Sequence, residues 1–448
     1  MFFYKRFIPG LAILSYMIGD EKSKECAVID PVRDVEEYLN VAKANGYTIK
    51  YILETHVHAD FVSGSKDLKD KLHGKPLIYC SALGGKEWLP SYCDHAVEDG
   101  DTIVFGNLQL TAMHTPGHTP EHIVWLAYDL ARSKETPWFV FTGDLLFVGD
   151  VGRPDLLGKE KLEKLEDDLY LSLFDKLKPL PDFVEIFPGH GQGSLCGKSL
   201  GSRDSSTLGF ERQFNPALRF QEKKAWTLKL MENMPKAPSY FSRMKKANVK
   251  GSKPLSDVLQ GLKLIKKEAD EIVWIDTRPS TLFLKDHQPG TLWLPRNPKF
   301  APWASYILPY DKPLGIIATT AEEARQAAVE LARVGLDTIV GYTLDPVNGG
   351  LSEIEYIAPP TLKTALKQGE EVSVIDVREP SEWAQGHIEG AVPVPLAELS
   401  SKNFSSEGNS KLVFVCASGT RALIAASYFD AQGLKNVRVL EGGMSAWN

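Results

Sequence analysis

Short apolar runs alternate with longer amphipathic stretches over roughly the first 250 residues. Residues 26–30 and 51–54 are typical of buried strands, because a few consecutive apolar residues bounded by polar ones fit a covered sheet. Residues 35–45 and 159–177 have helical spacing, and each stretch is closed by a glycine or a proline, which commonly end helices. This alternation predicts an α/β sandwich with covered sheets.

Four apolar runs of this region end in a turn that supplies a histidine or an aspartate. In a layered α/β fold, ligands gather at strand ends, where loops from neighbouring strands face one crevice. Imidazole nitrogens and carboxylate oxygens suit zinc or iron. One such turn alone could be a polar loop, but four of them predict a metal site. The runs are residues 51–54, 108–113, 138–141 and 183–187, and they lead to His56, His58 and Asp60, then to His118, Asp144 and His190.

Two stretches of the C-terminal part repeat each other. Residues 275–278 match residues 375–378, and residues 287–290 match residues 387–390, so both pairs lie 100 positions apart. Two copies of one small α/β domain explain the repeat most simply. A Lys-Gly-Ser-Lys-Pro segment at 250–254 indicates a linker before the first copy. Between the copies, two consecutive prolines follow Ala358, and we expect them to continue no regular element.

The two copies differ at the end of one strand. In the second copy, apolar residues 412–415 lead to Cys416 in a short loop that opens a helix. Loop amides, the helix dipole and the charge of Arg421 would stabilise a thiolate there. An exposed thiolate is a nucleophile or a sulfur carrier, and the Gly and Arg after Cys416 favour this interpretation over a buried structural cysteine. The first copy has Ala318 and Glu323 instead, which predicts a structural spacer or docking surface.

Composition and charge exclude several classes of protein. The 448 residues have room for two to four domains of ~150 residues. The net charge of -7 argues against nucleic acid, because contact with phosphates needs a basic face. Five widely spaced cysteines indicate a reduced cytosol rather than a disulfide framework.

Membrane insertion and export are not expected either. Apolar runs stay well below the ~20 residues needed to cross a bilayer. The N-terminal residues 1–18 could be mistaken for a signal peptide, but Pro9 and Gly10 interrupt them, so a hairpin fits better. We therefore expect a cytoplasmic protein without a membrane partner.

These motifs resemble two known families. The N-terminal part resembles the metallo-β-lactamase fold, and within it the persulfide dioxygenase branch. The C-terminal segments resemble rhodanese domains, and the order of the parts is similar to multidomain persulfide dioxygenase–sulfurtransferase fusions. The first resemblance rests on HVHAD at 56–60, TPGHT at 115–119, TGD at 142–144, GRPD at 152–155 and PGHG at 188–191. The second rests on DVRE at 376–379, GHIEGA at 386–391, CASGTR at 416–421 and EGGMSAW at 441–447.

The resemblance implies three domains. Residues 1–250 would form an αββα metallo-β-lactamase sandwich with the dioxygenase site. Residues 255–357 would form a degenerate, inactive rhodanese-like α/β domain, and residues 361–448 an active rhodanese domain.

The resemblance also implies the metal and its ligands. In the dioxygenases that the chain resembles, one ferrous iron per chain is held by residues that match His56, His118 and Asp144. Two histidines and one carboxylate leave positions open for substrate and oxygen. Hydrolytic relatives carry another histidine at the position of Phe61, where it helps to hold a second metal, so its replacement favours a mononuclear centre.

Further polar residues would surround that centre. His58, Asp60 and His190 would orient ligands or bind water. If His58 also bound the metal, however, the set would suit Zn²⁺ and hydrolysis. Cys196 lies in the Gly-rich loop after His190. It is either an auxiliary thiol that receives sulfane sulfur or a small residue packed under the loop.

The implied reaction couples an oxidation to a sulfur transfer. A low-molecular-weight persulfide, of glutathione or of coenzyme A, would react with O2 to give sulfite and the thiol. Cys416 would then pass sulfane sulfur to sulfite, giving thiosulfate, and we expect the protein to be a homo-oligomer. The loop that would cradle the persulfide consists of Ala417, Ser418, Gly419 and Thr420, followed by Arg421.

Two other functions remain open. One is a zinc-dependent thioester hydrolase similar to glyoxalase II, with the rhodanese part as an accessory. The other is a non-catalytic protein in which Cys416 relays sulfur to a partner.

Overall fold

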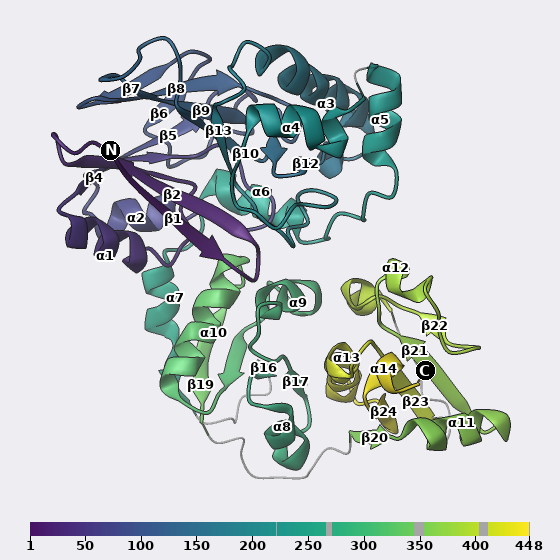
Figure 1. The fold of residues 1–448 in the computed structure, drawn as a ribbon. Helices are drawn as coiled ribbons and strands as arrows, with labels where there is room; N and C mark the ends of the chain where they lie inside the picture. The colour runs from purple at the N-terminus through teal and green to yellow at the C-terminus, as the bar shows by residue number, and fades with distance from the viewer. Residues whose placement is uncertain (221, 266–270, 345–353, 403–410, 448) are drawn as a thin grey trace. The chain divides into compact units, whose positions relative to one another are not determined.

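The computed structural model describes residues 1–220, 222–265, 271–344, 354–402 and 411–447, and its chain divides into two compact units (Figure 1). The first unit is Met1–Leu255 with Arg333–Gly335, and the second is Ser256–Ala332 with Leu336–Asn448. Among the described residues, no helix has both the length and the apolar character needed to cross a membrane.

The first unit begins with a mixed sheet of six strands in the order β1-β2-β3-β4-β5-β6. β1 and β2 form the predicted N-terminal hairpin, and β3 to β6 run parallel to one another. The strands are β1 Phe2–Ile8, β2 Ile13–Gly19, β3 Glu25–Ile29, β4 Thr48–Leu53, β5 Leu77–Ser81 and β6 His95–Val97.

A second sheet of six strands has the order β14-β13-β10-β9-β8-β7, and a two-stranded ribbon of β11 and β12 accompanies it. β13 runs parallel to β10, and the other neighbours are antiparallel. The strands are β7 Thr102–Phe105, β8 Leu108–His114, β9 Ile123–Asp129, β10 Phe139–Gly143, β11 Leu146–Phe147, β12 Asp150–Val151, β13 Glu185–Pro188 and β14 Ser206–Thr207.

Helices cover the outer faces of the two sheets. Figure 1 shows α1 and α2 beside the first sheet and α3, α4 and α5 beside the second. The helix predicted from residue 159 continues beyond α3 as a π-helical segment, Ser172–Lys176. The helices are α1 Glu36–Asn45, α2 Ser65–Lys71, α3 Lys159–Leu171, α4 Leu208–Phe214, α5 Lys223–Met231 and α6 Phe241–Lys250, with short 3-10 turns at Asp155–Leu157 and Pro216–Leu218.

β9 shows why an apolar run forms a covered strand here. Ile123, Trp125 and Ala127 belong to the core between the two sheets. Val124 and Leu126 point the other way and pack with side chains of the helices. Successive side chains of a strand face opposite sides, so a strand that is covered on both faces is apolar throughout. The predicted α/β sandwich with covered sheets is confirmed.

The second unit contains two five-stranded sheets. Their orders are β15-β19-β18-β16-β17 and β20-β24-β23-β21-β22, and all neighbouring strands are parallel. The strands are β15 Lys263–Leu264, β16 Val273–Asp276, β17 Thr291–Trp293, β18 Leu314–Ile317, β19 Ile339–Thr343, β20 Glu355–Ile357, β21 Val372–Asp376, β22 Val392–Pro393, β23 Lys411–Val415 and β24 Val437–Leu440.

The two consecutive prolines lie at a boundary between elements, as expected. β20 ends at Ile357, and the prolines begin α11, Pro359–Lys367. Proline fits the first turn of a helix because the N–H groups there have no intrahelical partner. The other helices are α7 Leu255–Gly261, α8 Ser280–Asp286, α9 Phe300–Ile307, α10 Ala321–Arg333, α12 Pro380–Trp383, α13 Thr420–Ala431 and α14 Gly443–Trp447, with a 3-10 helix at Leu396–Ser401.

Candidate functional site

Three side chains from three strand ends converge in the first unit. His56 follows β4, His118 follows β8 and Asp144 follows β10, and all three are buried. The Oδ2 atom of Asp144 lies 3.8 Å from Nε2 of His56 and 3.4 Å from Nε2 of His118. One ligand atom from each residue lies within 4.8 Å of the others, which is the spacing of a group that can share one metal ion.

Two glycines allow the turns that carry these side chains. Gly117 has φ +147, and a Cβ there would lie 2.4 Å from the Cα of Leu169. Gly143 has φ +49, and a Cβ there would lie 2.7 Å from Nε2 of His122. Residues with a side chain rarely adopt such backbone angles and would collide here. The strand ends therefore need glycine to bring His118 and Asp144 close to their neighbours.

The inner atoms of the three residues have no hydrogen-bond partner among the described residues: Nε2 of His56, Nε2 of His118 and Oδ2 of Asp144. Their outer atoms are all bonded. Nδ1 of His118 donates to the carbonyl of Arg153 at 2.9 Å, and Oδ1 of Asp144 accepts from Nδ1 of His190 at 2.7 Å. Buried polar atoms without partners are rare unless a ligand serves them. The donor set fits a divalent metal ion.

The charges of the site also favour a cation. Burial lowers the pKa of His56 and of His118, so both imidazoles stay neutral. Although burial alone would raise it, the pKa of Asp144 is lowered, chiefly by His190. Metal ligands must be deprotonated to bind, and these three groups are deprotonated at neutral pH.

His190 connects Asp144 to Asp60. Its Nε2 atom lies 2.8 Å from Oδ2 of Asp60, while Nδ1 donates to Asp144. Burial opposes a charge on His190, but the carboxylates of Asp144 and Asp60 raise its pKa to about 10. The imidazolium therefore orients Asp144 by a charge-assisted hydrogen bond.

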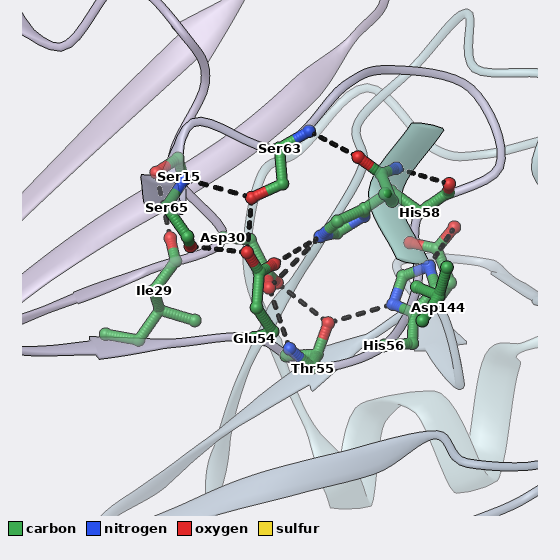
Figure 2. Close-up of polar contacts among 12 residues, drawn as sticks. Ser15, Ile29, Asp30, Glu54, Thr55, His56, His58, Ser63, Ser65 and Asp144 are labelled. Carbon is green, nitrogen blue, oxygen red and sulfur yellow. Dashed lines mark hydrogen bonds and ion pairs between the residues drawn. The ribbon is translucent and has the colours of Figure 1, made fainter. Parts of the chain in front are cut away.

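His58 takes no part in this convergence. Its Nε2 atom lies 3.2 Å from Oδ1 of Asp30 and 3.3 Å from Oε2 of Glu54. Figure 2 shows the imidazole turned toward these two carboxylates, with His56 and Asp144 to its other side. Burial alone would lower the pKa of His58, but Asp30 and Glu54 raise it well above its usual value.

The loop that contains Cys416 lies in the second unit, between β23 and α13. The N–H of Gly419 donates to Sγ of Cys416 at 3.1 Å. Arg421 forms two hydrogen bonds with Glu382, at 2.6 and 2.7 Å. Cys416 is only 1% exposed, so the exposed thiolate that we expected is wrong. The reason is the start of α14, where the N–H of Met444 donates to the carbonyl of Cys416 at 2.8 Å and closes the loop.

Comparisons with known proteins agree with both parts. A model described as the metallo-beta-lactamase superfamily matches residues 8–190, and one described as a rhodanese-like domain matches residues 358–448. The Bos taurus protein "Persulfide dioxygenase ETHE1, mitochondrial" is 32% identical over 213 residues, which are 47% of this chain and 74% of that protein. The chain belongs to the metallo-beta-lactamase superfamily.

Within the superfamily, the relatives differ in activity by name. An Arabidopsis thaliana protein, "Hydroxyacylglutathione hydrolase cytoplasmic", is 34% identical over 177 residues, which are 39% of this chain and 62% of that protein. The crystal structure of a metallo-beta-lactamase from Staphylococcus aureus subsp. aureus COL is 34% identical, with a TM-score of 0.69 over 77% of this chain and 98% of that one. The chain therefore has the superfamily fold, followed in the sequence by a rhodanese-like domain. These comparisons do not identify the substrate.

The first copy of the C-terminal repeat lies outside the matched ranges. Its sheet has the same strand order as that of the second copy. Ala318 follows β18, where Cys416 follows β23 in the second copy, and Glu323 hydrogen-bonds to Thr319. That it is a degenerate rhodanese domain stays a prediction, which the common strand order supports.

Cys196 is buried beside Asp60 and His190. The three residues offer ligand atoms within 4.8 Å of one another. Burial raises the pKa of the Cys196 thiol well above its usual value, and the carboxylates of Asp60 and Asp144 act in the same direction. The thiol thus borders the polar residues of the metal centre, in its neutral form.

Several residues that hold the site together escaped the sequence analysis. Oε1 of Glu121 accepts from the N–H of Val57 at 2.7 Å and from the hydroxyl of Thr119 at 2.9 Å, so it joins two ligand loops. The side-chain amide of Asn248 in α6 donates to the carbonyl of His58. Glu121 borders a histidine-rich motif and could have been suspected. Asn248 lies in an ordinary helical stretch, which gives no signal.

Proposed function

We propose that the chain is an iron-dependent persulfide dioxygenase joined to a sulfurtransferase. One observation carries this proposal: two neutral imidazoles and one carboxylate converge, and their facing atoms have no hydrogen-bond partner among the described residues, while Nε2 of His58 faces the carboxylates of Asp30 and Glu54 at 3.2 and 3.3 Å. Two histidines and one carboxylate are typical of non-haem iron sites that activate oxygen. A zinc hydrolase would be expected to use His58 as well.

His56, His118 and Asp144 would hold the metal. Ferrous iron, when bound there, offers open positions at which a persulfide and O2 can react. His190 keeps Asp144 ionised and oriented, because the imidazolium has one N–H toward Asp144 and the other toward Asp60. Phe61 is fully buried at the position where hydrolytic relatives carry a ligand to a second metal.

The oxidation balances with O2 as the oxidant. A persulfide RSSH, O2 and water give RSH, sulfite and two protons; the S–S bond breaks and the terminal sulfur takes up the oxygen atoms. We propose glutathione persulfide or coenzyme A persulfide as the substrate. Cys196 is the nearby thiol that could hold sulfane sulfur, because it borders Asp60 and His190.

The second step would take place at Cys416. Its thiol attacks the outer sulfur of a persulfide, giving a Cys416 persulfide and RSH, and sulfite then takes that sulfur to give thiosulfate. The N–H of Gly419, which already donates to Sγ of Cys416, would stabilise the attacking thiolate. Arg421 would supply a further positive charge, although Glu382 balances it. Joining the two sites in one chain raises the sulfite concentration near Cys416.

Oxygen uptake tests this proposal. Protein loaded anaerobically with Fe²⁺ should consume O2 when glutathione persulfide or coenzyme A persulfide is added, and it should release sulfite or thiosulfate. The variant His118→Ala should abolish the uptake, because it removes one of three ligands. Iron-loaded protein that consumes no O2 with either persulfide would contradict the proposal.

The second candidate is a zinc-dependent thioester hydrolase, which the similarity to a hydroxyacylglutathione hydrolase favours. It predicts hydrolysis of glutathione thioesters by the Zn²⁺-loaded protein under nitrogen. The same preparations can be assayed for both activities, so the two functions are separated directly.

A further inference from the structure

We propose that Asp30 and Glu54 hold His58 away from the metal centre and thereby limit that centre to two imidazole ligands. The inference rests on the proposed metal site of His56, His118 and Asp144, but not on the reaction that takes place there. His58 belongs to a sequence pattern in which it could bind the metal beside His56, two positions earlier. The structure instead gives the two histidines different partners.

Glu54 is fixed on the far side of His58. Its Oε1 atom accepts hydrogen bonds from the hydroxyls of Ser63 and Ser65, which leaves Oε2 facing Nε2 of His58 (Figure 2). All of these side chains are buried. A carboxylate that is held by two hydroxyls cannot rotate freely, so it offers a stationary acceptor for a proton on His58.

Asp30 affects both histidines, but with different results. It draws the imidazole of His58 toward itself, and through Thr55 it orients His56 toward the metal centre. Its Oδ1 atom lies 3.2 Å from Nε2 of His58. Its Oδ2 atom accepts from the hydroxyl of Thr55 at 2.8 Å, and Oγ1 of Thr55 lies 2.9 Å from Nδ1 of His56. The Thr55 hydroxyl donates its only hydrogen to Asp30, so it must accept a hydrogen bond from Nδ1–H of His56. Nε2 of His56 is thereby left with a lone pair toward the metal centre.

The backbone of the His58 loop is held by hydrogen bonds as well, so a change of partner for His58 would involve mainly its side chain. The amide nitrogen of Asn248 donates to the carbonyls of His58 and Phe61, both at 2.8 Å, and its oxygen accepts from the N–H of Ser63 at 2.8 Å. The ring centroids of His56 and His58 lie 4.3 Å apart. A rotation of the His58 side chain, without a movement of the loop, would therefore bring its imidazole toward the metal.

The consequence is the choice of metal. With His58 withheld, two imidazoles and one carboxylate leave several positions open, as oxygen-activating iron sites require. With His58 released, a third imidazole would complete a set that favours Zn²⁺. Asp30 and Glu54 are thus specificity-determining residues that act through His58.

Asp30, Glu54 and His58 could instead hold a second metal ion, because their ligand atoms lie within 4.8 Å of one another. The hydrogen bonds argue against this. Both oxygens of Asp30 already accept from Thr55, from its N–H and its hydroxyl at 2.8 Å each. One oxygen of Glu54 is likewise taken by serine hydroxyls. A second ion would have to compete with these bonds.

Glu54→Gln tests the inference, because Glu54 contacts His58 and not His56. We would load the full chain with one equivalent of Zn²⁺ or Fe²⁺ and count imidazole ligands by X-ray absorption. The wild type should show two imidazoles and Glu54→Gln three. Competition between the metals should shift toward Zn²⁺ by about 10-fold or more, the scale on which residues around a ligand affect metal affinity.

Two further variants separate this effect from a general disturbance. Glu54→Gln combined with His58→Ala should return to two imidazoles, because the released ligand is gone. Glu211→Gln is the matched control: Glu211 is also buried and also accepts hydrogen bonds, from the N–H of Gly149 and the side-chain amide of Asn215, but among the described residues it is bonded to neither His56 nor His58. It should keep the count at two. Thermal unfolding checks that each variant is folded.

The outcomes are distinct. Three imidazoles in the wild type, or a loss of one imidazole in His58→Ala alone, would show that His58 is a ligand and overturn the inference. So would an unchanged count in folded Glu54→Gln, or two bound metal ions in the wild type that fall to one in that variant. Oxygen uptake is measured separately: if it is absent while the counts follow expectation, the proposed function fails and the role of Glu54 stands.

Discussion

The two sheets of the second unit allow a comparison between a half that carries a thiol and a half that does not. Both sheets have the same strand order. Each has an arginine that folds back on an aspartate at the end of its second strand, with Nη2 to Oδ2 distances of 2.7 Å for Arg278 and Asp276 and 2.7 Å for Arg378 and Asp376. In each, a histidine stacks on an aromatic ring four positions earlier, at 3.9 and 3.8 Å.

The difference lies in the loop after the fourth strand. The second half has Cys416 under the N–H of Gly419, and Arg421 paired with Glu382. In the first half Ala318 follows the corresponding strand. The two halves thus share their strand pairing and the aspartate–arginine pair, and they differ in the loop where we propose that the chemistry takes place. Function is grafted onto such folds through local sites.

The largest effect should come from Cys416→Ser. A hydroxyl is a far weaker nucleophile toward sulfane sulfur, so thiosulfate formation should fall by about 10³-fold or more. Sulfite should accumulate as the end product while O2 uptake continues. The measurement is chromatography of sulfite and thiosulfate during persulfide turnover. Undiminished thiosulfate would mean that the two steps are not coupled through Cys416.

The two aspartate–arginine pairs should contribute equally to the stability of their halves. Asp276→Asn and Asp376→Asn each leave a buried guanidinium without its carboxylate, which typically costs about 3–5 kcal/mol. Hydrogen exchange followed by mass spectrometry should show faster exchange in β16 and β18 for the first variant, and in β21 and β23 for the second. A marked effect in only one half would contradict the view that the two scaffolds are equivalent.

A smaller effect is expected from Glu382→Gln. The pair of Glu382 and Arg421 is partly exposed, so its loss should cost no more than about 1 kcal/mol. The hydrogen bond from Arg421 lowers the pKa of Glu382. A carboxyl with a lowered pKa stabilises the fold above its unfolded pKa, and this contribution is lost as the pH falls through the folded value.

The stability difference between wild type and Glu382→Gln should therefore be full at neutral pH and shrink below the ordinary carboxyl range, which thermal unfolding at several pH values would reveal. Freeing Arg421 should also lower the KM for thiosulfate a few-fold with little change in kcat, because more positive charge would face the anion. A raised KM would show that Glu382 positions Arg421 rather than neutralising it.

The smallest expected effect is that of Ala318→Cys. The new thiol would occupy the position of Cys416 but would be followed by Glu323 where the second half has Arg421. We expect no sulfur transfer from it when Cys416 is replaced by serine. Recovery of thiosulfate formation in that double variant would show that the first half keeps a working loop.

The layered fold, the repeat and the placement of reactive residues at strand ends could be predicted from the amino-acid sequence. These features depend on the alternation of apolar and polar residues and on glycine at turns, which are local properties. His118 and Asp144 could be named as candidate residues of a metal site for this reason, and Cys416 as a thiol at a helix start. The burial of Cys416 could not be predicted, because it depends on α14, which follows much later in the chain.

The direction in which each histidine side chain faces could not be predicted, because it depends on how the chain packs. His56 and His58 stand two positions apart on one turn and look equivalent in the sequence. Glu54 and Thr55 are neighbours in the sequence, but two other groups come from elsewhere: Asp30, from the end of the preceding strand, faces His58, and Asn248 of α6 holds the His58 carbonyl. A buried polar side chain takes the orientation that satisfies its hydrogen bonds, and those bonds exist only once distant segments have packed together.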